Sequence, residues 1–189
     1  MRSGAIVGIL LAAGSATRFG GDKLLAPLAD GTAIGVAAFK NLAAAVDAVV
    51  AVVRPGDERL AAALAACGAR VTACPQASEG MGTSLAWGVR AAPIASAWLV
   101  ALADMPWIRP ASVAGVVEAL RNGATLAAPS WRDSRGHPVG FVSSFYPELA
   151  RLSGDDGAKA ILARHPITLV ETDDDGVVRD IDTREDLAG

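Results

Sequence analysis

Residues 8–25 read GILLAAGSATRFGGDKLL. An apolar run from Ala5 to Leu11 ends abruptly in the small residues of 12–14. A short, continuously apolar run that stops at small residues is typical of a strand buried on both faces of a sheet. The stretch therefore predicts a buried first strand that leads directly into a loop with small side chains.

Similar apolar runs recur along the first two thirds of the chain, with helix-length segments between them. The predicted strands are Ala5–Leu11, Ala48–Val53, Arg70–Ala73, Trp98–Ala103 and Thr125–Ala128. The predicted helices are Ile34–Val46, Asp57–Cys67, Thr83–Ala92 and Ala111–Asn122. Because helices that connect parallel strands make right-handed crossovers, this alternation predicts an α/β fold with a doubly wound, Rossmann-like, mostly parallel sheet.

The regular alternation of predicted strands and helices ends after Pro129. We expect a polar loop before a short strand at Val139–Val142, and then two short helices separated at Gly154. Two late strands are predicted in ITLVET (167–172) and VVRDID (177–182), joined by a turn in the DDDG of 173–176. No linker or shift in composition divides the chain, so residues 1–189 are expected to form a single domain.

Composition excludes several classes of protein. The formal net charge of −3 and the lack of a basic stripe argue against a nucleic-acid partner. Two cysteines make neither a disulfide framework nor a zinc site. Arg2 and the apolar stretch after it imitate a signal peptide, but a single positive residue is a poor match. No apolar run reaches the roughly 18 residues that span a bilayer, so we expect a soluble, cytoplasmic protein without a membrane partner.

The loop after the first predicted strand has the features of an anion site. Ligands of open α/β sheets bind beyond the carboxyl ends of the strands, and Gly14 lets backbone N–H groups approach an anion. Arg18 and Lys23 add cations suited to phosphate oxygens. The loop matches neither the dinucleotide fingerprint nor the P-loop, and an ordinary turn with solvated charges is the alternative.

Acidic residues follow two other predicted strands. Asp104 comes directly after the apolar run WLVALA, at the sheet edge where the first loop lies. It is either a cap of the next helix or a ligand of Mg²⁺, which prefers carboxylates together with substrate phosphates. Asp180 and Asp182 share one face of the last predicted strand, so either could reach that metal. Asp182 also resembles a helix cap, with Glu185 at capping-box spacing.

Six motifs carry a resemblance to a known family. LLAAGSATRFGGDKLL, EGMGTSL, LADMP, RGHPVGF, GDDGAKAIL and DIDTREDL occur in the order seen in MobA-like nucleotidyltransferases. Within that family the sequence resembles the molybdenum cofactor cytidylyltransferases, from about Val7 to Leu187. The resemblance implies a sheet of the nucleotide-diphospho-sugar transferase type. It also implies Mg²⁺, with Mn²⁺ as a substitute, as the metal.

The resemblance implies a role for each matching residue. The catalytic residues would be Arg18, Lys23 and Asp104, and the metal ligands would be Asp104 and Asp182. The nucleotide would contact Leu11, Ala12, Ala13, Gly14, Arg18, Lys23, Gly80, Met81, Gly82, Thr83 and Ser84. The acceptor would contact Gly136, His137, Pro138, Asp155, Gly157 and Lys159. Ala16 departs from the family pattern, where serine is frequent, and Ser15 or Thr17 could supply the missing hydroxyl.

The implied reaction transfers CMP from CTP to the phosphate of molybdopterin, with release of pyrophosphate. Ala13 resembles the CTP-using members, whereas a glycine there is more frequent in the guanylyltransferases, which use GTP. A molybdoenzyme or its chaperone is the candidate protein partner. The alternatives are transfer to another phosphorylated small molecule, a non-catalytic nucleotide-binding module, and a nicotinamide-dependent oxidoreductase. The missing dinucleotide fingerprint argues against the oxidoreductase.

Overall fold

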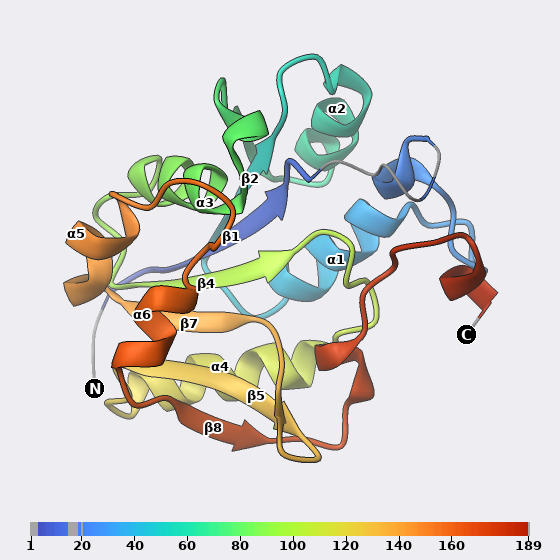
Figure 1. The fold of residues 1–189 in the computed structure, drawn as a ribbon. Helices are drawn as coiled ribbons and strands as arrows, with labels where there is room; N and C mark the ends of the chain where they lie inside the picture. The colour runs from blue at the N-terminus through green and yellow to red at the C-terminus, as the bar shows by residue number, and fades with distance from the viewer. Residues whose placement is uncertain (1–3, 15–18, 20, 189) are drawn as a thin grey trace.

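The computed structural model describes residues 4–14, 19 and 21–188, which form a central sheet with helices on both faces (Figure 1). The strands are β1 (Ile6–Ala12), β2 (Ala48–Val53), β3 (Arg70–Ala73), β4 (Ala97–Leu102), β5 (Leu126–Trp131), β6 (Ser134–Arg135), β7 (Val139–Val142) and β8 (Thr168–Glu171). The α-helices are α1 (Ile34–Ala43), α2 (Glu58–Ala66), α3 (Met81–Arg90), α4 (Pro110–Arg121), α5 (Tyr146–Leu149) and α6 (Lys159–Arg164). The 3₁₀ helices are η1 (Lys23–Leu25), η2 (Ala77–Glu79), η3 (Ser143–Phe145), η4 (Asp175–Val178) and η5 (Glu185–Ala188).

The sheet has the strand order β3-β2-β1-β4-β7-β5-β6, and β8 pairs with β5. β1 pairs in parallel with both β2 and β4, so the carboxyl ends of these three strands meet at one edge. β6 and β7 run antiparallel to their neighbours. The predicted doubly wound, mostly parallel α/β fold is confirmed.

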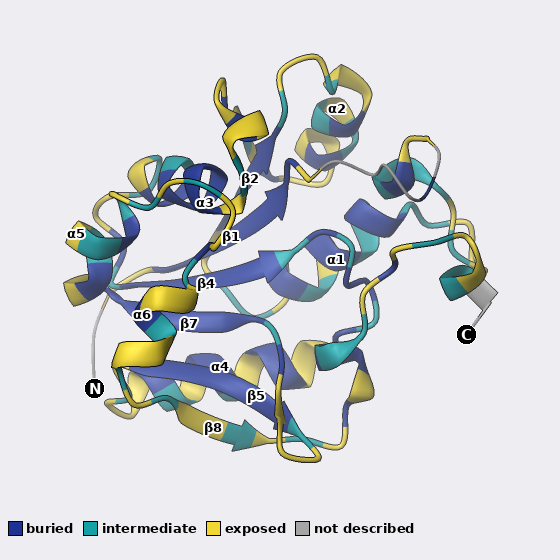
Figure 2. Cartoon of the chain, in the orientation of Figure 1, coloured by how far each residue is buried: buried dark blue, intermediate teal, exposed yellow. Residues whose placement is uncertain are grey.

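Residues of β1 alternate between the two helical layers. A Cβ added to Gly8 would lie 2.8 Å from the Leu42 side chain of α1, whereas Ile9 packs against Gly88 of α3 on the other face. All seven residues of β1 are buried, and Figure 2 shows the same burial along the central strands. A strand covered on both faces needs apolar residues at every position, which explains the unbroken run seen in the sequence.

The segment expected to be a polar loop after Pro129 is a β-hairpin. β5 continues to Trp131 and pairs with β6 in the register Ser130↔Arg135 and Trp131↔Ser134. Arg132 and Asp133 form the two-residue turn, with φ of 47° and 64°. Paired positive φ values are what a tight two-residue hairpin requires, although glycine or asparagine usually signals it. The sequence lacks that signal, which is why the hairpin was not predicted.

The prediction of two late strands joined by a turn is wrong for the second strand. ITLVET forms β8, which pairs in parallel with β5. VVRDID begins within η4 and continues as an extended segment outside the sheet. Its backbone bonds to loops: the His137 N–H donates to the Val177 carbonyl at 2.8 Å, and the Ile181 N–H donates to the Asp104 carbonyl at 2.9 Å. Alternating apolar residues here mark burial of Val177 and Ile181 against those loops.

In the part of the chain that the structure describes, no helix combines the length and the apolar character needed to cross a membrane.

Candidate active site

A cavity of about 800 Å³ opens beyond the carboxyl ends of β1, β2 and β4. Its described lining comprises Leu11, Ala12, Ala13, Gly14, Gly21, Asp22, Lys23, Leu24, Leu25, Arg54, Gly56, Asp57, Glu58, Arg59, Leu60, Ala77, Ser78, Gly80, Met81, Ser84, Leu102, Asp104, Asp155 and Asp182. Most of the residues predicted to bind a nucleotide therefore share one cavity. Of that set, Gly82 and Thr83 are buried in the first turn of α3 and are not part of this lining; Gly82 packs against the Ser153 carbonyl, and the Thr83 hydroxyl accepts from the Gly154 N–H at 3.2 Å.

The loop after β1 leaves space in the cavity. A Cβ added to Gly14 would meet no described atom within 4 Å, so packing within the protein does not require the glycine. Ala12 and Ala13 are buried, with exposed fractions of 2% and 7%. The loop therefore lets a ligand approach the backbone closely. The predicted cation Arg18, together with Ser15, Ala16 and Thr17, lies outside the described residues.

Lys23 is buried at one end of the cavity, at the start of η1. Its Nζ donates to Oδ2 of Asp104 at 2.8 Å and to the carbonyl of Ile181 at 2.6 Å. Oδ1 of Asp182 lies 3.8 Å from the same nitrogen. Lys23 is 9% exposed, and a buried ammonium needs such partners because burial alone disfavours its charge. The predicted proximity of Lys23, Asp104 and Asp182 is thus present in the structure.

Asp180 adds a third carboxylate beside Lys23. We call the carboxylates of Asp104, Asp180 and Asp182 the carboxylate corner. Ligand oxygens of Asp104, Asp180 and Asp182 all lie within 4.8 Å of one another. Burial raises the pKa of Asp180, the charges of Asp104 and Asp182 raise it further, and Lys23 opposes them. One ammonium cannot neutralise three carboxylates, so the corner attracts further positive charge. A set of carboxylate oxygens at this spacing fits a hard divalent cation such as Mg²⁺ or Mn²⁺.

The two segments predicted to contact the acceptor, Asp155–Lys159 and Gly136–Pro138, pack against different parts of the molecule. The first lies near the start of α3. A Cβ on Gly80, which has φ of 124°, would overlap the Asp155 carboxylate. A Cβ on Gly157 would lie 3.3 Å from the Met81 sulfur. The structure thus places Asp155 on the wall of the cavity and Gly157 beside Met81, close to residues predicted to contact the nucleotide, and the assignment of both to the acceptor stays a prediction. Lys159 follows as the exposed first residue of α6.

The other acceptor segment, Gly136–Pro138, packs against η4. A Cβ on Gly136 would overlap the Val177 carbonyl. Burial lowers the pKa of His137, and a hydrogen bond with the Val100 backbone and the charge of Asp104 oppose that shift only in part. The imidazole is therefore neutral near pH 7, and its Nδ1 is buried without a hydrogen-bond partner among the described residues.

The sequence reasoning missed one charged wall of the cavity. Arg54 follows β2 directly and bonds both oxygens of Asp57, at 3.0 and 3.2 Å. Arg59 of α2 reaches across to Asp22 at 3.3 Å. The rule that ligands bind beyond strand carboxyl ends applies to β2 as well as to β1 and β4, so it could have identified Arg54. The separation of Asp22 and Arg59 along the sequence does not predict their contact.

An open, mostly parallel sheet with a cavity at its carboxyl edge, a loop of small residues and a lysine among carboxylates is the arrangement of a ligand-binding α/β protein. The sequence profile of the MobA-like NTP transferase domain matches residues 8–169. The chain belongs to this family of nucleotidyltransferases.

The chain is similar to individual proteins that have differing names. The chain is 32% identical over 192 residues to nicotine blue oxidoreductase of Paenarthrobacter nicotinovorans, which covers 96% of this chain and 94% of that protein. It is 31% identical over 203 residues to the purine catabolism protein PucB of Bacillus subtilis (strain 168), covering 98% and 96%. The crystal structure of Rv0371c from Mycobacterium tuberculosis H37Rv superposes with a TM-score of 0.84 at 28% identity, covering 100% and 97%. Rv0371c has also been crystallised as a manganese complex, which matches at 27% identity with a TM-score of 0.79 and covers 97% and 96%.

Proposed function

We propose that this protein transfers CMP from CTP to the phosphate of molybdopterin, in the free or metal-loaded cofactor, and releases pyrophosphate. The observation that carries the proposal is the continuity of the cavity. Its lining runs from the small-residue loop at Leu11–Gly14 to the corner of Lys23, Asp104 and Asp182. A nucleotide with its sugar and base along the loop would direct its phosphates toward that corner.

The residues of the corner suit nucleotidyl transfer. An acceptor phosphate is already ionised at pH 7, so attack on the α-phosphorus requires no general base. Catalysis then consists of positioning and of stabilising the charge that develops on the phosphate oxygens. Lys23 supplies a positive charge at the corner, and Arg18 would add a second from the sequence-predicted phosphate loop.

Asp104 and Asp182 would hold the metal, with Asp180 as a neighbouring carboxylate. A bound Mg²⁺ or Mn²⁺ would neutralise charge on the triphosphate as pyrophosphate leaves. Ligand oxygens of the three carboxylates lie within 4.8 Å of one another, close enough to share a cation, and the related Rv0371c has been crystallised with manganese. Asp104→Asn should abolish most metal-dependent turnover, because the amide still accepts a hydrogen bond from Lys23 but cannot balance a divalent charge.

Ala13 supports CTP over GTP. Its buried Cβ lies in the cavity wall beside Gly14, where a purine needs more room than a pyrimidine. Ala13→Gly should therefore raise the kcat/KM for GTP relative to CTP. An unchanged ratio would show that another part of the wall selects the base.

Two alternatives remain outside this proposal, and one set of measurements separates them. Pyrophosphate release is measured with CTP, GTP and UTP, each with molybdopterin and Mg²⁺ or Mn²⁺, for the wild type and Asp104→Asn. The proposal predicts release that requires CTP, the acceptor and Asp104. The name of the 32% identical relative favours an oxidoreductase as the second candidate. Oxidation of NADH or NADPH without pyrophosphate release would establish that candidate, and nucleotide binding without either reaction would establish a binding module.

A further inference from the structure

The extended segment that carries Asp180 and Asp182 has an arginine stacked on an aromatic ring at each end. The guanidinium carbon of Arg184 lies 5.1 Å from the ring centre of Phe19, which follows the first loop. That of Arg179 lies 4.5 Å from the ring centre of Trp107. Arg184 therefore lies next to the first loop. Arg179 has no role in the nucleotide site proposed above.

The Arg179–Trp107 stack lies close to the carboxylate corner. The chain from Asp104 to Arg109 runs beside the chain from Asp174 to Ile181. The two are joined by the bond from Ile181 N–H to the Asp104 carbonyl at 2.9 Å and the bond from Arg109 N–H to the Asp174 carboxylate at 2.7 Å. Trp107 is three residues from Asp104, a span of at most about 10 Å even when fully extended, and Arg179 directly precedes Asp180.

The stack lies outside the cavity lining: the cavity opens beyond β1, β2 and β4, whereas η4, which ends just before Arg179, bonds to the segment before β7 through the Val177 carbonyl and the His137 N–H. Asp104 and Asp182 belong to the described cavity lining, but Asp180, Arg179 and Trp107 do not. An in-line transfer places the attacking oxygen opposite the departing pyrophosphate. If the triphosphate occupies the cavity, the acceptor phosphate reaches the α-phosphorus on the face away from the pyrophosphate, and the stack is a cation next to the carboxylates but outside the cavity lining.

Arg179 has the chemistry of an anion-binding residue held in place. Trp107 packs against the buried cluster of Phe19, Ile34 and Ile181, so the ring is a firm support. Asp175 lies 3.3 Å from Nη1 of Arg179, with side chains 54% and 38% exposed, which makes a weak surface pair. A guanidinium has five N–H donors in a planar fork that matches phosphate, and this contact uses one of them.

We propose that Arg179, supported by the Trp107 ring, binds the phosphate of the acceptor. This inference rests on the proposed function, since it assigns the acceptor side of the same site. It makes Arg179 a determinant of acceptor affinity that leaves nucleotide affinity unchanged.

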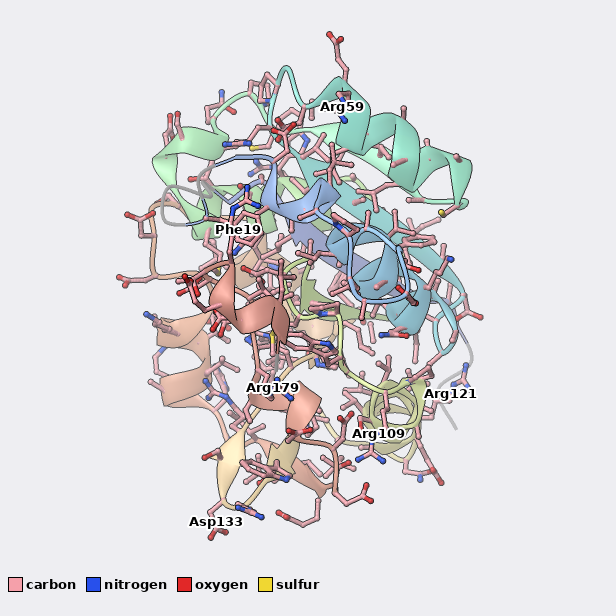
Figure 3. The ribbon with its side chains drawn as sticks, turned by 90° about the vertical axis from the view of Figure 1, so that its right-hand side faces the viewer. Phe19, Arg59, Arg109, Arg121, Asp133 and Arg179 are labelled. Carbon is pink, nitrogen blue, oxygen red and sulfur yellow. The ribbon has the colours of Figure 1, made fainter. Side chains whose placement is uncertain are left out.

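The chain supplies a matched control. Arg132 stacks on Trp131 at the same 4.5 Å, but this pair lies at the turn between β5 and β6. In Figure 3 the neighbouring Asp133 lies at the lower end of the molecule, whereas Arg179 lies near its middle, below Phe19. A change at Arg132 therefore removes an equivalent stack without touching the carboxylate corner.

The test measures molybdopterin affinity through pterin fluorescence, and CTP·Mg²⁺ affinity by calorimetry, in Arg179→Gln, Arg179→Lys and Arg132→Gln. We expect Arg179→Gln to weaken molybdopterin binding at least about tenfold, the loss typical of a charged hydrogen bond. Arg179→Lys should recover part of this loss, and the CTP affinity of all three variants should match that of the wild type. Arg132→Gln should also keep wild-type molybdopterin affinity.

Each other result has a definite meaning. The inference is overturned if Arg179→Gln binds molybdopterin normally, if it loses CTP affinity equally, or if the wild type does not bind molybdopterin. An equal loss in Arg132→Gln also overturns it, because any stacked arginine would then suffice. Arg179-dependent binding without pyrophosphate release from any nucleotide would instead refute the proposed reaction and leave the anion site standing.

Discussion

Among single residues, Lys23 is a cation in direct contact with the carboxylate corner. Its ammonium bonds Asp104 and the Ile181 carbonyl while lying 3.8 Å from Asp182. This arrangement neutralises part of the corner in the ligand-free protein. It also puts a positive charge where a divalent cation would bind, so lysine and metal compete for the Asp104 carboxylate.

Lys23→Gln separates these two effects. The amide still donates to Asp104 and to the Ile181 carbonyl, so the fold should persist. Turnover should fall about 10²- to 10³-fold in both kcat and kcat/KM, the loss typical of one transition-state donor. Mn²⁺ affinity of the nucleotide-free protein should rise, because a competing charge is gone. The exposed Lys40 provides the control, as Lys40→Gln should change neither quantity. A rise in KM alone would show that Lys23 acts only in ground-state binding.

Gly14 tests whether the first loop is a binding element or an ordinary turn. Alanine fits there without meeting any described atom within 4 Å, so the thermal midpoint of Gly14→Ala should equal that of the wild type. The added methyl group would enter the cavity and should weaken CTP binding by about tenfold, since overfilling a packed contact costs about 1–3 kcal/mol. Calorimetric titration with CTP checks this. Unchanged affinity would support the ordinary-turn interpretation.

The proximity of Lys23 and Asp104 could be predicted from the sequence, because residues that follow neighbouring parallel strands meet at the carboxyl edge of the sheet. Lys23 follows β1 through the first loop, and Asp104 follows β4, so parallel pairing brings both to the same edge. Asp182 was placed there for a wrong reason, since it lies on an extended segment outside the sheet and not on a strand. The contact between Asp22 and Arg59 depends on how α2 is oriented, which no local pattern encodes.

Among the elements, the segment from Asp174 to Asp182 positions two of the three carboxylates. Asp174 anchors it: its carboxylate accepts from the hydroxyl of Ser112 at 2.6 Å and from the backbone of Arg109 and Gly176 at 2.7 and 3.1 Å. The side chain is 3% exposed, so these donors replace water. Asp174 thereby ties η4 to the beginning of α4 and fixes the register of the segment against Asp104.

Asp174→Asn should destabilise the protein by about 2 kcal/mol at pH 7, because an amide group would face donors inside a buried site. Burial raises the pKa of Asp174, but the hydrogen bonds from Ser112, Arg109 and Gly176 lower it more, and the net shift is downward. A lowered folded-state pKa stabilises the protein above the unfolded-state value of about 4, and this contribution disappears as pH falls through the folded-state pKa.

Urea unfolding of both proteins at pH 7 and at pH 3 checks this prediction. The stability difference between wild type and Asp174→Asn should narrow at the lower pH. The adjacent Asp173, which is 91% exposed, supplies the control, and Asp173→Asn should unfold like the wild type. A difference that stays constant with pH would mean that Asp174 acts through packing and not through its charge.

Elements with strong local patterns were predictable, and those defined by distant partners were not. β1, β2 and β4 are unbroken apolar runs, and the helices between them begin within a few residues of their predicted starts. β8 was predicted as a strand from ITLVET, but its parallel pairing with β5 was not, because three of its four residues are exposed and no local pattern identifies its partner. The alternation in VVRDID looked like a strand because Val177 and Ile181 are buried, but loops provide their partners.

In the whole molecule, the sheet gathers chain segments that are far apart in sequence. The loop at Leu11–Gly14, the residues after β4 and the segment after η4 meet at one edge, around a cavity of about 800 Å³ (Figure 1). We expect this cavity to hold a nucleoside triphosphate whose phosphates reach a metal bound between Asp104 and Asp182.

Anomalous scattering from a crystal grown with CTP and Mn²⁺ tests this claim most directly. We expect a manganese peak within coordination distance of Asp104 and Asp182. The triphosphate should lie beside Lys23, and the base should lie along Leu11–Gly14. Asp104→Asn crystals treated in the same way should lack the peak. A manganese peak away from these carboxylates, or a nucleotide bound outside the cavity, would contradict the account.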